Sequence, residues 1–400
     1  MASLMASVAL TIDAMLPALG IIGDDLGVSD PNKAQYVLVY MFAGMAMGQL
    51  VCGPLSDALG RKRLLYIGLA IYALGSLVSM FATSMPMMLA GRFIQGIGAA
   101  GPYVSSVAIV RDRFKGDEMG RVMSLIMMIF IFVPAIAPAL GQLVMFVASW
   151  RWIFGIFFFF ALTIFLVTRF YLPETLPPEK RIPFNPGNIG RGFREIFTHP
   201  VTAGYMVCMG LTFGGFTGYL NSTRQLFQET FHTGDMFSVW FGCLALVFGL
   251  SSMLNARIVR HVGGKRLVRV AAASLVITSA LFIAFTHFYG LSFPAFVAYI
   301  ATLYFAVALM FGNLNALAME PMGHIAGIAA AVIGSSSSLL SLSLGTFIGQ
   351  MYDGTPVPVA TGFLVLPCIS LAIMRWITQK QARMEQTPVP VPEEAAQGEA

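Results

Sequence analysis

Two charged side chains lie inside otherwise apolar stretches of this sequence, and they are the residues best suited to do chemistry there. Asp13 is the acidic residue of the apolar run 2–22, and Arg92 is the basic residue of the run 86–110. Burying a carboxylate in such a segment is costly unless the group is paired or protonated. We therefore expect Asp13 to bind and release a proton or a cationic part of a substrate, with Arg92 biasing its protonation.

The expected depths of Asp13 and Arg92 allow them to interact, either directly or through Gln95 and water. Pro17 strengthens the case for Asp13, because a proline four residues later has no N–H to bond the carbonyl of Asp13 and so weakens the helix. A simpler alternative stays open for each residue. Asp13 could cap or pack locally, and Arg92 could join helices through hydrogen bonds.

The elements that carry these residues are membrane-spanning helices. Hydrophobic residues make up 57% of the 400 residues, charged residues 11%, and mean hydropathy is +0.77, which is too apolar for a soluble domain of this length. A helix crosses the hydrocarbon with about 20 apolar residues, and runs of that length without ten-residue alternation favour helices over barrel strands. The sequence predicts an all-α polytopic membrane protein with twelve transmembrane helices, near 2–22, 36–57, 63–83, 86–110, 120–147, 152–172, 201–222, 236–258, 266–287, 293–317, 325–349 and 357–377.

The chain divides into two related six-helix halves. Gly60-Arg61-Lys62-Arg63-Leu64 between the second and third spans is echoed by Gly263-Gly264-Lys265-Arg266-Leu267 in the second half. The connection between the halves is rich in proline, as linkers are, and its basic part near Arg191 could form a surface helix. We expect an N-terminal six-helix bundle at 1–172, a cytoplasmic linker at 173–200, a C-terminal six-helix bundle at 201–378 and a disordered cytoplasmic tail at 379–400.

Basic residues set the expected orientation, because cytoplasmic loops collect Lys and Arg. With the N-terminus inside, twenty of the 24 Lys and Arg fall at cytoplasmic loops, helix ends and the tail, and three fall outside. Both termini are then cytoplasmic, and the net charge of +5 reflects orientation and not nucleic-acid binding. The sequence contains no Gly-x-x-x-x-Gly-Lys-Ser/Thr phosphate loop and no His/Asp or Ser/His constellation, which argues against an ATP-driven pump and against an enzyme.

The charged loop at 53–63 resembles a known family signature. Gly53-Pro54-Leu55-Ser56-Asp57-Ala58-Leu59-Gly60-Arg61-Lys62 is similar to the Gly-x-Leu-x-Asp-Arg-x-Gly-Arg-Lys motif of major facilitator transporters, with Ala58 in place of arginine. Six-helix halves related by an axis along the membrane normal also fit that superfamily. The resemblance implies a latch between the halves, in which Gly53, Asp57, Gly60 and Arg61 are gating residues.

Asp57 needs a positive partner, because it lies at the negative end of its own helix. Arg61, one turn further on, is one candidate. The N-terminus of the eleventh span, near 323–327, is the other. Lys62 and Arg63 are more simply explained by the orientation rule.

Further motifs resemble the drug/proton antiporters of the Bcr/CflA (bicyclomycin-resistance) type. They are Asp13-Ala14-Met15-Leu16-Pro17-Ala18-Leu19, Arg92-Phe93-Ile94-Gln95-Gly96-Ile97-Gly98-Ala99 and Pro134-Ala135-Ile136-Ala137-Pro138-Ala139-Leu140-Gly141. The last departs from the general antiporter pattern Gly-Pro-x-x-Gly-Gly, because Ala137 precedes Pro138 and Gln142 follows Gly141. We expect Pro17, Pro138 and Gly141 to shape and pack the helices.

The resemblance implies a proton-coupled multidrug efflux transporter of the bacterial inner membrane, exporting small lipophilic or cationic compounds by alternating access. Its expected partners are a small-molecule substrate and the lipid bilayer; it is expected to act as a monomer, with protons as coupling ion and no other cofactor or metal. The alternative is a transporter or facilitator of a specific metabolite, for example a sugar, amino acid or peptide, with the same fold. Polar residues in spans line cavities or join helices, and the candidates for the cavity are Tyr36, Tyr40, Gln95 and Asn313.

Overall fold

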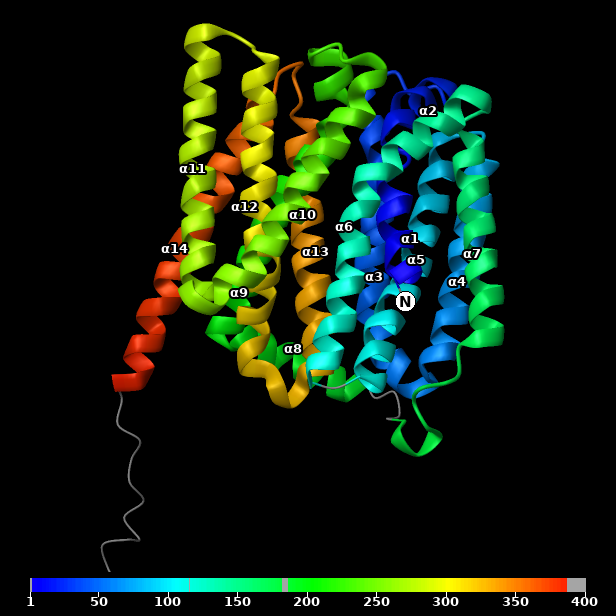
Figure 1. Cartoon of the computed structure of the whole chain (residues 1–400), viewed down its shortest axis with the longest axis vertical. Coiled ribbons are helices and arrows are strands. Elements are labelled where there is room, and N and C mark those ends of the chain that lie inside the picture. The colour runs from blue at the N-terminus through cyan, green and yellow to red at the C-terminus, as the bar shows by residue number, and fades with distance from the viewer. Residues whose placement is uncertain (1, 115, 182–185, 387–400) are drawn as a thin grey trace, which may run out of the picture.

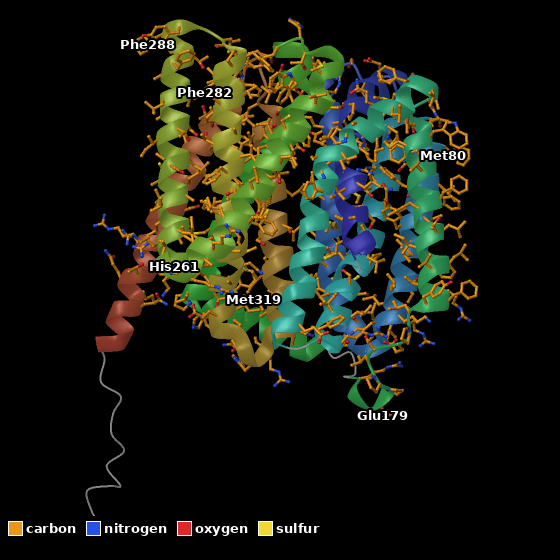
Figure 2. The ribbon with its side chains drawn as sticks, in the orientation of Figure 1. Met80, Glu179, His261, Phe282, Phe288 and Met319 are labelled. Carbon is orange, nitrogen blue, oxygen red and sulfur yellow. The ribbon has the colours of Figure 1, made fainter. Side chains whose placement is uncertain are left out.

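The computed structural model describes residues 2–114, 116–181 and 186–386, and every regular element in these ranges is a helix (Figure 1). The helices stand side by side as one bundle. We call the end where the connection between the two halves lies the linker end; Glu179 and Met319 mark it in Figure 2. Phe288 marks the opposite end.

The first half contains seven helices and two short turns, because the first span is interrupted. Its elements are α1 (Ala2–Asp13), η1 (Leu16–Ala18), α2 (Leu19–Asp25), η2 (Pro31–Gln35), α3 (Tyr36–Leu59), α4 (Arg61–Met80), α5 (Met85–Arg113), α6 (Gly116–Val147) and α7 (Arg151–Tyr171). Helix α5 packs against α3 and α4, α1 packs against α6 and α5, and α7 covers α4.

The second half follows a connection that carries its own helix. The connection contains η3 (Pro178–Lys180) and α8 (Pro186–Thr198). The elements of the second half are α9 (Pro200–Arg224), the π-helix η4 (Gln225–Thr230), η5 (Gly234–Met236), α10 (Phe237–Val262), α11 (Gly264–Tyr289), α12 (Phe293–Met319), η6 (Glu320–Ile325), α13 (Ala326–Gln350) and α14 (Val357–Gln386). Helix α9 packs against α12, α13 and α14. The basic stretch of the connection does form a helix, α8, which contacts α9 and α13.

In the described part of the chain, ten helices are long and apolar enough to cross a membrane. The two remaining predicted spans correspond to α6 and α9. Within α6, Phe132–Val147 forms a shorter apolar helical stretch. Helix α9 is less apolar, because glycine, threonine, serine and asparagine occupy much of it. Most side chains of α9 are buried against other helices, so these polar residues are shielded from lipid.

Helix α14 extends beyond the residue at which the tail is expected to begin. The sequence predicts a disordered tail from 379, but α14 continues to Gln386, because the segment after the span consists of good helix formers such as Gln, Lys, Ala and Arg. The rest of the predicted tail, 387–400, lies outside the described residues.

Two helix pairs join the halves. Helix α3 lies antiparallel to α13, and α6 lies against α10. The α3–α13 pair meets at both ends, since a β-carbon on Gly53 would lie 3.1 Å from the Ala331 β-carbon, and one on Gly349 would lie 2.4 Å from Gln35 Oε1. The site between the halves is therefore framed by these two seams.

Close backbone approach fixes α1 against α6. The chain interrupts its first span after Asp13, at the turn that contains Pro17, and α6 passes directly beside this break. A β-carbon on Gly141 would lie 1.7 Å from the carbonyl oxygen of Ala14, so only glycine fits here. Pro138 lies inside α6, one turn before Gly141.

Replacing Gly141 by alanine should destabilise the protein, because the added methyl group collides with the Ala14 carbonyl. Overpacking of this kind costs about 1–3 kcal/mol. The measurement is the thermal unfolding midpoint of the purified protein in detergent. Gly312→Ala is the matched control, since a β-carbon there meets nothing within 4 Å; equal midpoints for the two variants would contradict the packing argument.

Candidate functional site

Arg92 joins three helices in the interior of the first half. Its side chain is completely buried, and Nε donates to the Val37 carbonyl of α3 at 3.1 Å, while Nη2 donates to the Thr11 carbonyl of α1 at 3.4 Å. Nη1 donates to Gln95 Oε1 at 2.6 Å, and the guanidinium carbon lies 5.7 Å from the Phe154 ring centre. The contacts of Arg92 therefore fit the alternative in which it joins helices through hydrogen bonds.

Gln95 belongs to the same buried cluster. Its amide nitrogen donates to Ser76 Oγ of α4 at 2.8 Å, and its side chain has no exposed surface. Thr11 and Tyr72 also share a hydrogen bond between their hydroxyls. Gln95 thus faces the contact between α4 and α5 in this conformation, where it supports Arg92.

Asp13 is the last residue of α1 and is 5% exposed. Among the described residues, no hydrogen bond or ion pair to its carboxyl group is found, and Arg92 bonds the carbonyl of Thr11 two residues earlier. The carboxyl lies within electrostatic range of Tyr304, which belongs to α12 of the other half. Asp13 is therefore a buried acid at the meeting of the two halves, without a direct partner.

The other predicted cavity residues are spread over the bundle. Asn313 of α12 is 7% exposed, and its amide donates to Asn255 Oδ1 of α10 at 2.8 Å. Tyr36 is partly buried at the start of α3, and Tyr40 one turn later is 40% exposed. The structure does not bring these side chains together with Asp13, and Tyr36, Tyr40, Gln95 and Asn313 stay cavity predictions.

A charged cluster occupies the linker end of the first half. Arg61 is 4% exposed, and its guanidinium bonds Asp57 Oδ1 at 2.5 Å, Asp112 Oδ2 at 2.9 Å and Ser56 Oγ at 2.9 Å. Its backbone N–H donates to Glu174 Oε1 at 3.1 Å. Arg61 is therefore the cation that Asp57 requires at the end of α3.

Asp57 also faces the other half. A β-carbon on Gly327, in the first turn of α13, would lie 3.8 Å from Asp57 Oδ2. Gly60 makes the turn between α3 and α4 with φ +95, and a β-carbon there would lie 2.6 Å from Glu174 Oε2. A glycine is required because this backbone conformation disfavours side chains and the carboxylate leaves no room.

Uncharged side chains join the halves at the opposite end. Gln35 Nε2 donates to Gln225 Oε1 at 2.6 Å and to the Gly349 carbonyl at 3.0 Å. Gln225 Nε2 donates to Asn32 Oδ1 at 2.7 Å, and Gln350 Nε2 donates to the Asn32 carbonyl at 2.8 Å. We call these residues, Asn32, Gln35, Gln225, Gly349 and Gln350, the amide network.

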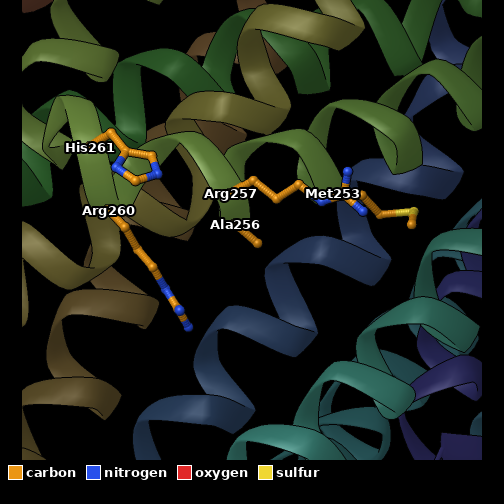
Figure 3. Close-up of a pocket in the computed structure, with 5 residues that line it drawn as sticks. All are labelled: Met253, Ala256, Arg257, Arg260 and His261. Atoms are coloured by element: carbon orange, nitrogen blue, oxygen red, sulfur yellow. The ribbon is translucent and has the colours of Figure 1, made fainter.

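A cavity of about 660 Å³ lies along the last turns of α10, toward the linker end (Figure 3). Two arginine side chains give its rim a positive charge, and a histidine and apolar side chains complete its lining. The residues that line it are Met253, Ala256, Arg257, Arg260 and His261. Along α10, the cavity lies between the centre of the bundle and the linker end.

Sequence reasoning identified Arg61 as a partner of Asp57 but missed the other partners of the charged cluster and the amide network. Asp112 had a signal, because an acid between Arg111 and Arg113 at a helix end suggests a structural ion pair. Glu174 follows a proline in the connection and carries no such signal. The amide network depends on residues from three distant segments, and no local pattern identifies it.

Replacing Arg61 by glutamine should lower stability, because Asp57 and Asp112 lose their shared cation. Removing one partner of a largely buried pair costs about 3–5 kcal/mol, and the part-exposed carboxylates should reduce this to about 2 kcal/mol. The measurement is the thermal unfolding midpoint. Arg63→Gln, at an exposed neighbouring position, is the control; an equal midpoint for both variants would show that the cluster adds nothing net.

Replacing Gln35 by alanine should loosen the opposite end, because the variant loses the bonds to Gln225 and Gly349. With about 1 kcal/mol per hydrogen bond, backbone hydrogen exchange at 349–352 should rise about tenfold or more. Mass spectrometry of the exchanged protein measures this. Gln381→Ala at the linker end should leave that segment unchanged, and unchanged exchange in the Gln35 variant would contradict the role of the network.

Comparison with known proteins agrees with this architecture. The chain is 30% identical over 375 residues to the uncharacterized MFS-type transporter YdgK of Bacillus subtilis, covering 93% of this chain and 92% of that protein. It is 29% identical to a bicyclomycin resistance protein homolog of Haemophilus influenzae, covering 91% of each, and 25% identical to the multidrug resistance protein MdtL of Salmonella typhimurium, covering 95% and 94%.

Among solved structures, the peptide transporter POT in complex with sulfate matches with a TM-score of 0.74 and 13% identity, covering 96% of this chain and 93% of that one. At this identity the likeness concerns the fold alone. The family model of the Major Facilitator Superfamily matches residues 1–380. The chain is thus a multi-pass membrane transporter that belongs to the Major Facilitator Superfamily.

Proposed function

We propose that this protein is a proton-coupled multidrug efflux transporter that exports small lipophilic or cationic compounds by alternating access. The observation that carries the proposal is the carboxyl group of Asp13. It is 5% exposed, it lies where α1 breaks between the two halves, and no partner neutralises it among the described residues. A buried acid in a membrane-spanning helix is retained for function, because burial without a partner is otherwise costly.

In the proposed cycle, Asp13 holds either a proton or the cationic part of a substrate. A proton neutralises the carboxylate and removes the attraction for a cation, so the two ligands exclude each other. Exchange of one for the other on opposite sides of the membrane couples export to proton entry. Arg92 acts as a positioning residue, because its bond to the Thr11 carbonyl fixes the end of α1 that carries Asp13.

In this cycle, the two ends of the bundle act as the inner and outer gates. We place the protein in the inner membrane of a bacterium, with the linker end in the cytoplasm, as the distribution of basic residues predicts. The cavity along α10 then opens toward the cytoplasm, while the amide network holds the outer end together. Asp57, Arg61, Gly53 and Gly60 form the inner gate against the first turns of α13.

The relatives support drug export as the biological role. Two of them carry drug-resistance names, and each aligns over more than nine tenths of this chain. The alternative of a specific metabolite shares the fold, as the peptide transporter shows. The lone acid beside the break in α1 favours proton coupling over simple facilitation. In this proposal the protein works as a monomer, and protons are its coupling ion.

A drug-susceptibility panel tests the proposal in a bacterial host that lacks its own efflux pumps. Expression should protect against several chemically unrelated lipophilic compounds, and a proton uncoupler should abolish their export. Protection against none of the compounds, with transport of a single metabolite, would overturn drug export in favour of the alternative.

Replacing Asp13 by asparagine should abolish proton-driven export, because the amide cannot exchange a proton at physiological pH. Everted membrane vesicles energised by a proton gradient provide the measurement, with accumulation of a fluorescent drug as the readout. Asp24→Asn is the matched control, since Asp24 lies exposed in the following helix. Undiminished export by the Asp13 variant would remove that residue from the coupling role.

A further inference from the structure

Five aromatic rings of the second half gather between α9, α10 and α12. Tyr304 is at the centre, with ring centres 5.3 Å from Phe216, 5.7 Å from Tyr219, 6.4 Å from Phe248 and 6.5 Å from Phe241. Most of these pairs meet edge to face, which is the favourable arrangement for aromatic rings. We call these five residues the aromatic cluster.

The aromatic cluster contains two hydroxyl groups without hydrogen-bond partners. Tyr219 is 1% exposed and Tyr304 is 3% exposed; their hydroxyls lie close to each other, but neither makes a hydrogen bond of good geometry. Tyr299 shows the usual arrangement for a buried tyrosine of α12, because its hydroxyl bonds Ser279 at 2.9 Å. Buried polar groups are nearly always paired, so two neighbouring exceptions in one cluster call for an explanation.

The unpaired hydroxyls lie toward Asp13. Tyr304 lies within electrostatic range of Asp13 across the boundary between the halves, and Tyr219 stands beside Tyr304. Three polar groups that lack partners therefore gather at the centre of the bundle: two neutral donors from the second half and one acid from the first. A compound that satisfies all three would remove the cost of burying them.

A further pair of aromatic rings lies on α9 and α12, on the linker side of the aromatic cluster. Phe311 of α12 is 43% exposed, and its ring centre lies 4.7 Å from that of Phe213 on α9. Phe216 and Phe248 of the aromatic cluster are only partly buried. Met253, at the edge of the α10 cavity, lies little more than one turn beyond Phe248 along that helix. Along α10, apolar side chains therefore extend from the aromatic cluster toward the α10 cavity.

We propose that Tyr219 and Tyr304 bind the substrate, donating their hydroxyl protons to an acceptor oxygen of the transported compound. The aromatic rings take its apolar part, and Asp13 takes its ammonium group. The favoured substrate class is lipophilic ammonium compounds that carry a carbonyl or ether oxygen a few bonds from the nitrogen. This inference rests on the proposed function in placing a substrate beside Asp13, and it adds the oxygen-binding groups.

Two matched probes test the proposal: octyl(dimethyl)phenacylammonium and octyl(dimethyl)(2-phenylethyl)ammonium, which differ only by a carbonyl in place of a methylene. Binding to the full-length protein in lipid nanodiscs is measured without a proton gradient, at one neutral pH. We expect the wild type to bind the carbonyl probe about tenfold or more tightly, because the methylene leaves both hydroxyls unpaired.

The variants Tyr219→Phe and Tyr304→Phe should each weaken binding of the carbonyl probe by up to about tenfold, without weakening the methylene probe. In the double variant the two affinities should agree within about twofold. Tyr299→Phe is the matched control and should keep the wild-type preference, because its hydroxyl bonds Ser279 away from the cluster. The proposal would be overturned if the wild type bound both probes equally or bound neither. It would also be overturned if the tyrosine variants lost the same affinity for both probes.

Asp13→Asn separates this inference from proton coupling. The asparagine variant should weaken both probes by the same factor, because both carry the same permanent charge, and should keep their ratio. If that variant exports drugs normally but the carbonyl preference still disappears with the tyrosine hydroxyls, the coupling role fails while the oxygen-binding role stands. A carbonyl preference lost in Asp13→Asn alone would contradict the independent role of the tyrosines.

Discussion

The interior of a membrane protein offers almost no water, so each polar group inside it depends on partners from the chain itself. Arg92 satisfies this constraint within one half, through two backbone carbonyls and Gln95. Asp13, Tyr219 and Tyr304 do not satisfy it, although all three are nearly as deeply buried. In our proposals, this contrast separates groups that hold the bundle together from groups that bind a ligand.

The membrane environment also favours close packing of the helices. In the first half, a β-carbon on Gly96 would lie 2.2 Å from the Met41 carbonyl oxygen, and one on Gly98 would lie 2.2 Å from the Tyr72 backbone nitrogen. Within lipid, no hydrophobic driving force brings helices together, so dispersion contacts between closely packed helices have to do so. Small residues allow this close contact between backbones. The rigid packing of α3, α4 and α5 provides the frame against which α1 presents Asp13.

Much of the fold could be predicted from the sequence, because apolar runs of helical length and the repeated basic turn are local signals. Asp13, Arg92, Asp57 and Arg61 were also identifiable, since a charge stands out in an apolar span or beside a helix end. The pairing of Asp57 with Arg61 could also be predicted, because the two lie one helical turn apart, whereas partners from distant segments, such as Asp112 and Glu174 at Arg61, could not. Whether Arg92 contacts a carboxylate or a backbone carbonyl depends on its depth in the membrane to within about one helical turn. Span boundaries predicted from the sequence are less accurate than that.

The aromatic cluster shows the limit of sequence reasoning most clearly. Phenylalanine is abundant throughout the chain, with 33 residues, so composition does not distinguish rings that face lipid from rings that meet inside. Tyr219 and Tyr304 come from helices separated by some eighty residues, and only the packing of α9 on α12 places their rings together. Their lack of partners is visible only after every neighbouring donor and acceptor has been placed.

The amide network has a consequence for the energetics of the transport cycle. Its bonds between the halves join side-chain amides to amide and backbone carbonyl oxygens, all of them uncharged. A membrane potential does work of about 2.3 kcal/mol on each elementary charge that crosses 100 mV, but breaking and remaking these bonds moves no net charge. Breaking these bonds is therefore electrically silent, and in the proposed cycle the potential acts on charged groups: the ions carried at the centre and residues such as Arg224, whose guanidinium packs on Gly20 of the first half.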